Sequence, residues 1–169
     1  MSEIEFSRPT RVSPLPRDGL AIAIEANASE RAALARLNNL AAIERLNASF
    51  RIAKWRRGVH VEGELSARVT QTCVVSLEPF EVDIEEPIDV KFLPAEATPA
   101  AESVADDDAP DGFVDGKINL GALAGEFLTL ALDPYPRKPG AAFGPSAAPT
   151  PRESPFSRLR ALGDNEEPD

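Results

Sequence analysis

The sequence has very few of the residues that bind metals or form cross-links. Of its 169 residues, one is a cysteine, Cys73, and one is a histidine, His60. A single cysteine excludes a disulfide within the chain, and with it the small secreted scaffolds that depend on such bonds. A tetrahedral zinc site needs four ligands of this kind, and no Cys–His or Ser–His–Asp set stands out. We therefore expect a protein that is not an enzyme and that binds no metal and no cofactor.

Long hydrophobic runs and an excess of positive charge are missing too. No stretch approaches the roughly 20 apolar residues needed to span a bilayer, and no basic segment followed by an apolar run opens the chain. These absences predict a cytoplasmic protein with no membrane partner. With 28 acidic and 18 basic residues, the formal net charge is −10. Nucleic acid would therefore have to bind at a local basic patch.

The length fits one domain with tails. Eight of the 16 prolines follow Leu132, so the end of the chain is a poor candidate for a core. We predict disordered tails at both ends. The predicted divisions are an extended arm over 1–14, a single domain over 15–139 with an acidic loop at 94–116, and a Pro/Ala-rich tail over 140–169 with a short docking segment at 154–162.

Alternation of apolar and polar residues is the clearest local signal. From Val59 to Cys73 every second residue except Gln71 is apolar or small, which is the period of a strand with one buried face. The full pattern predicts strands near 19–26, 46–57, 59–74 and 80–92, a hairpin about Arg57–Gly58, and helices at 29–40 and 118–132. We expect an α+β fold in which one or two helices pack on a curved antiparallel sheet or small open barrel. Pro87 lacks an amide hydrogen and places its strand at an edge or at a bulge.

A basic cluster surrounds the one tryptophan. Arg51, Lys54, Arg56 and Arg57 flank Trp55, and residues 36–57 carry six basic residues and one acidic, a net charge of +5. Such a cluster can neutralise phosphates, while an exposed tryptophan can stack on an unpaired base. We therefore assign RNA binding to these five residues. The alternative is that Trp55 lies in the core and the arginines are its solvated neighbours.

Acidic residues gather in the following segment. Residues 76–116 carry 13 acidic residues and one basic, a net charge of −12. The triplet Asp106–Asp108 lacks the spacing of a calcium loop. Glu126 is expected at the surface or in a salt bridge rather than as a general base, because an unpaired buried charge is costly. His60 is expected to be exposed and without a chemical role.

The order of several short motifs resembles a known family. Cys73 is followed by Ser76 and then Pro79–Phe80. A helix signature comprises Ile118, Leu120, Glu126, the run Leu130–Leu132 and Pro134, and a terminal motif comprises Pro155–Phe156 and Leu159. This set looks like the YceD family of large ribosomal RNA accumulation proteins, in particular its alphaproteobacterial branch. Ser76 occupies the place of the family's second cysteine.

The resemblance implies a non-enzymatic factor in ribosome biogenesis. Such a factor would promote accumulation or maturation of large-subunit (23S) ribosomal RNA by binding precursor RNA or the assembling subunit. The alternative is an acidic adaptor or escort that holds a basic ribosomal protein on Glu81, Asp83, Glu85 and Asp89. Binding to bare RNA that weakens steeply with salt distinguishes the first from the second.

Overall fold

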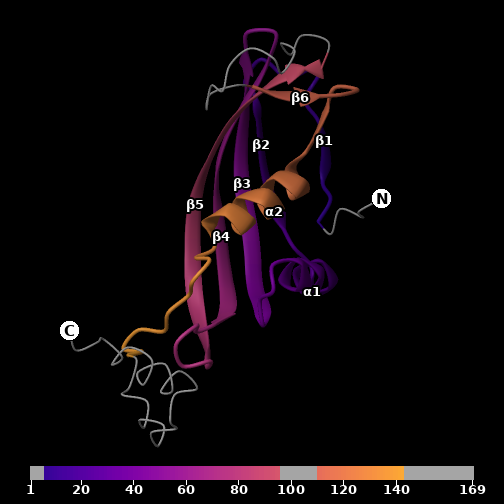
Figure 1. The fold of residues 1–169 in the computed structure, drawn as a ribbon. Coiled ribbons are helices and arrows are strands. Elements are labelled where there is room, and N and C mark those ends of the chain that lie inside the picture. The colour runs from indigo at the N-terminus through magenta and orange to yellow at the C-terminus, as the bar shows by residue number, and fades with distance from the viewer. Residues whose placement is uncertain (1–5, 96–109, 143–169) are drawn as a thin grey trace, which may run out of the picture.

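A five-stranded sheet is the centre of the molecule. The structure, a computed structural model, describes residues 6–95 and 110–142. The sheet order is β2-β3-β4-β5-β6. The strands are β2 (Leu20–Glu25), β3 (Ala42–Trp55), β4 (Gly58–Thr72), β5 (Pro79–Pro94) and β6 (Asp111–Phe113). The first four pair antiparallel, and β6 adds parallel to the last three residues of β5. The three long strands curve together along the molecule (Figure 1).

Two helices and a small second sheet complete the fold. The second sheet pairs β1 (Pro9–Arg11) with β7 (Lys117–Asn119). Helix α1 (Ala28–Leu37) packs against β3, and α2 (Leu120–Ala131) crosses the sheet and contacts β4 and β5 (Figure 1). No helix within residues 6–95 and 110–142 is both long and apolar enough to cross a membrane.

Alternating side chains give the sheet an inner and an outer face. On the inner face Ile52, Val61 and Leu65 are fully buried, and from α2 so are Leu120 and Leu128. Each fully buried leucine contributes roughly 1.5–3 kcal/mol relative to an exposed one. The outer face carries the polar residues of the same strands, so whatever binds there meets charged and hydroxyl groups.

Polar residues before the helices fix where they begin. The side chain of Asn27 accepts from the backbone N–H groups of Ser29 and Glu30, and the Glu30 carboxylate accepts from the N–H of Asn27, which is a capping box at the start of α1. Asn119 accepts from the N–H of Ala122 and caps α2.

The predicted α+β fold with an open, curved sheet is confirmed, with differences at the element ends. Strand β3 begins at Ala42, four residues before the predicted strand. Helix α1 ends at Leu37 rather than near 40, and α2 begins at Leu120 rather than at 118. Residues 111–113, which we placed in the acidic loop, form β6 instead. Three residues are too few to show a period of two, so no local pattern marks β6 or β1. The docking segment predicted at 154–162 lies outside the described residues.

Pro87 lies on the edge side of the sheet. It pairs with Glu64 of β4, while β6 reaches only residues 92–94 of β5. The strand continues through Pro87 without a register shift. Of the two alternatives for this residue, the structure therefore shows an edge position.

Candidate nucleic-acid interface

The β3–β4 hairpin presents two arginines at one end of the sheet. Trp55 pairs with Gly58, so the predicted hairpin is present, but its turn consists of Arg56 and Arg57, one residue before the predicted Arg57–Gly58. Arg56 has a φ of 50°, in the left-handed region. Gly58 is required by space, because a Cβ there would lie 1.8 Å from the carbonyl oxygen of Phe92. The turn is thus short and tightly held, and both arginines are exposed.

A cleft of about 570 Å³ lies beside this turn. Its charged lining residues are Lys54, Arg56 and Arg57, and all three are basic. The opposite wall comes from residues 12–15 of the N-terminal segment and from Phe113 of β6. We call this space the basic cleft. It can accept an anion such as a phosphate, since the described residues of its lining offer ammonium and guanidinium donors and no carboxylate.

Trp55 lies neither in the core nor fully exposed, the two alternatives that the sequence left open. Its side chain is half-buried on the outer face of β3. The guanidinium carbon of Arg56 lies 4.6 Å from the centroid of the indole ring, and Nζ of Lys91 lies 5.9 Å from it. Both distances are within the range of a cation–π interaction. Trp55 therefore holds the Arg56 side chain in place beside the basic cleft.

The structure does not bring all five predicted residues together. Lys54, Arg56 and Arg57 line the basic cleft. Trp55 does not line it but contacts the side chain of Arg56. Arg51 lies on the outer face of the sheet, in register with Glu62. Sequence reasoning missed residues 12–15 and Phe113, because they are more than 35 residues away in sequence and carry no charge that would mark them.

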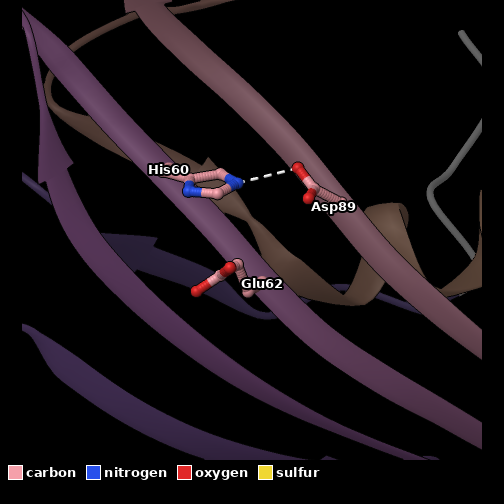
Figure 2. Close-up of side chains that lie close together, drawn as sticks. All are labelled: His60, Glu62 and Asp89. Atoms are coloured by element: carbon pink, nitrogen blue, oxygen red, sulfur yellow. Dashed lines mark hydrogen bonds and ion pairs between the residues drawn. The ribbon is translucent and has the colours of Figure 1, made fainter.

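A small cluster of ligand-type residues lies on the outer face. Nε2 of His60 lies 2.7 Å from Oδ1 of Asp89, and Glu62 lies within 4.8 Å of both (Figure 2). His60 is half-buried and the two carboxylates are exposed. The cluster offers three ligand atoms, one fewer than a structural zinc site takes from the protein. The contact with Asp89 holds the imidazole of His60 in its position. Sequence reasoning did not predict this partner.

The motif around Cys73 closes the opposite end of the sheet. Sγ of Cys73 is buried and accepts from the backbone N–H groups of Val75 and Ser76, each at 3.4 Å. The Ser76 hydroxyl, together with backbone N–H groups, lowers the pKa of the Cys73 thiol to about 6. Nζ of Lys138 lies 2.9 Å from the Glu78 carboxylate, which ties the segment after α2 to this turn. The geometry gives these residues a structural role at the end of the sheet.

Four further motif residues, Pro79, Phe80, Glu126 and Pro134, lie at element ends or on the surface. Pro79 and Phe80 begin β5, and Pro134 follows the end of α2. Glu126 is exposed on α2, as expected, and lines a hollow of about 330 Å³ with Asp111 and Lys117.

Comparison with known proteins supplies the family. The family described as "Large ribosomal RNA subunit accumulation protein YceD" matches residues 61–162, more than half of the chain. Neither the curated proteins nor the solved structures gave a match. The matched range begins in β4 and includes the Cys73 turn, β5 and α2, the elements that carry the motifs. The chain therefore belongs to the YceD family of large ribosomal RNA subunit accumulation proteins, which supports a role in ribosome biogenesis.

Proposed function

We propose that this YceD-family protein promotes accumulation of large-subunit ribosomal RNA by binding precursor RNA, or the RNA of the assembling subunit, at the basic cleft. One observation carries the proposal. In a chain with a net charge of −10, the charged residues that line this cleft are Lys54, Arg56 and Arg57. The family description supplies the class of RNA.

The basic cleft suits a sugar–phosphate backbone for two reasons. Each lysine or arginine that contacts a phosphate releases bound counterions from the RNA, which favours binding. One of these cations is also held in position, since the Arg56 side chain packs on Trp55. Less conformational entropy is then lost when the RNA binds. Acidic side chains elsewhere repel RNA and direct it toward this end of the sheet.

A charge-neutral triple variant tests the proposal. In K54Q/R56Q/R57Q the basic cleft keeps polar side chains of similar length and loses its three charges. The control R36Q/R45Q/R51Q removes the same number of charges from exposed arginines outside the cleft. Binding of both to a large-subunit ribosomal RNA fragment is measured by fluorescence anisotropy over a range of salt concentrations.

The cleft variant should bind the RNA more weakly, and the slope of log K against log[salt] should fall by up to about 2, near 0.7 for each of three lost phosphate contacts on a single strand. The control should stay close to wild type. Equal losses of RNA affinity in the two variants would show that overall charge, rather than the basic cleft, determines binding. Unchanged affinity in both variants would show that the basic cleft does not bind the RNA.

A further inference from the structure

Another hollow lies on the outer face of the sheet, away from the basic cleft. It has a volume of about 420 Å³ and lies over β2, β3 and β4. Ala23, Ser49 and Ser66 leave the space open because their side chains are small. We call it the acidic hollow. The residues that define it are Ala23, Glu25, Asn47, Ser49, Glu64 and Ser66.

The charged groups of the acidic hollow only accept hydrogen bonds. Glu25 and Glu64 are exposed carboxylates, which carry no donor. A ligand that brings charged N–H donors therefore matches both of them.

The charge around the acidic hollow is strongly negative. Strand register places Glu85 opposite Ser66, and it places Asp89 opposite Glu62, four residues before Ser66 in β4. Across these three rows of the outer face there are five carboxylates, from Glu25, Glu62, Glu64, Glu85 and Asp89, and one basic side chain, Arg51. This field attracts cations and repels phosphates.

We propose that the acidic hollow binds an arginine side chain from an extended, arginine-rich segment of a partner protein. A guanidinium group carries five N–H donors in one plane, so it can bond the carboxylates of Glu25 and Glu64. Glu62 lies two residues from Glu64 along β4, a spacing of about 7 Å. A second arginine two positions away in an extended segment has the same spacing and reaches Glu62. This surface is separate from the basic cleft, so the inference does not depend on RNA binding.

A peptide titration tests the inference with the full chain. The probe is a ten-residue peptide of alternating Ser and Arg, titrated by calorimetry and followed by amide shifts in NMR spectra. The variant E25Q/E64Q removes two carboxylates from the acidic hollow. The control E81Q/E126Q removes two exposed carboxylates that lie outside it. Circular dichroism checks that both variants are folded.

The peptide should shift amides of residues 23–25, 47–49 and 62–66, and E25Q/E64Q should weaken its binding at least tenfold. The control should change it less than threefold. Equal weakening in both variants, or shifts spread over the whole sheet, would overturn the proposal. Binding of spermidine as tight as that of the peptide would assign the hollow to a free polyamine instead. If RNA displaces the peptide and shifts the same amide signals, the acidic hollow binds nucleic acid instead.

Discussion

Replacing Gly63 with alanine tests how the long strands pack against each other. Gly63 lies in β4 between Phe50 of β3 and Ile88 of β5. A Cβ at this position would lie 2.2 Å from the carbonyl oxygen of Ser49 and 3.2 Å from Cδ1 of Phe50. Cβ atoms essentially never approach other heavy atoms within 3.0 Å, and a backbone oxygen cannot rotate away. Strands β3 and β4 would therefore have to separate locally.

Conformational preference and steric overlap change the free energy of unfolding of G63A in opposite directions. Glycine inside a strand costs roughly 0.5–1 kcal/mol relative to alanine, so conformational preference alone predicts that G63A is stabilised. Overpacking of a well-packed core typically costs about 1–3 kcal/mol. Since the clash involves backbone, we expect the steric cost to win and the free energy of unfolding to fall by about 1–2 kcal/mol. With an m-value of about 2 kcal/mol/M, the urea midpoint should fall by about 0.5–1 M.

Gly125 in α2 provides the matched control. A Cβ there lies 3.4 Å from Cδ2 of Leu34, an ordinary contact. Because alanine favours a helix over glycine by up to about 1 kcal/mol, G125A should raise the urea midpoint. The same substitution is thus expected to act in opposite directions at the two sites. A midpoint for G63A equal to or above that of wild type would refute the steric argument.

Three further outcomes follow from buried and hydrogen-bonded groups. Leu128 is fully buried, so L128A should lower the free energy of unfolding by about 2–5 kcal/mol, measured by thermal or urea unfolding. The hydrogen bonds from Arg8 hold the pKa of Glu30 below its ordinary value of 4.5, so this pair stabilises the fold above that pH and the stabilisation is lost as the pH falls through the lower folded-state pKa. The difference in unfolding free energy between wild type and E30Q should accordingly shrink from about pH 6 to about pH 3, and a constant difference would contradict this account. The Ser76 hydroxyl contributes most to lowering the pKa of Cys73. In S76A the thiolate absorbance should therefore appear at higher pH than in wild type, and an unchanged midpoint would show that the hydroxyl does not reach Sγ.

The parts of the fold set by local pattern were predictable. Alternation over 59–73 predicts β4, and Asn27 and Asn119 predict the starts of both helices. The β1–β7 pair was not predictable, because Pro9 and Asn119 are paired across 110 residues and each strand has only three. Nothing in such short segments indicates which partner they choose.

The candidate site was predictable in part, for a similar reason. The cations of the hairpin stand out in the sequence, but the wall formed by residues 12–15 is supplied by the tertiary fold alone. The face of the sheet on which Arg51 lies could have been predicted from the strand period. In a strand, residues 51 and 54 point to opposite faces because they are an odd number apart. Applied to the predicted strand, that rule separates Arg51 from Lys54.

Photocrosslinking of the full chain to large-subunit ribosomal RNA, with mass spectrometry of the crosslinked peptides, tests the central claim most directly. If the basic cleft binds the RNA, crosslinks should concentrate at residues 54–58 and 12–15, which form its two walls. They should disappear in K54Q/R56Q/R57Q and persist in R36Q/R45Q/R51Q. Crosslinks concentrated on the acidic outer face of β5, or no crosslinks above an unirradiated control, would contradict the claim.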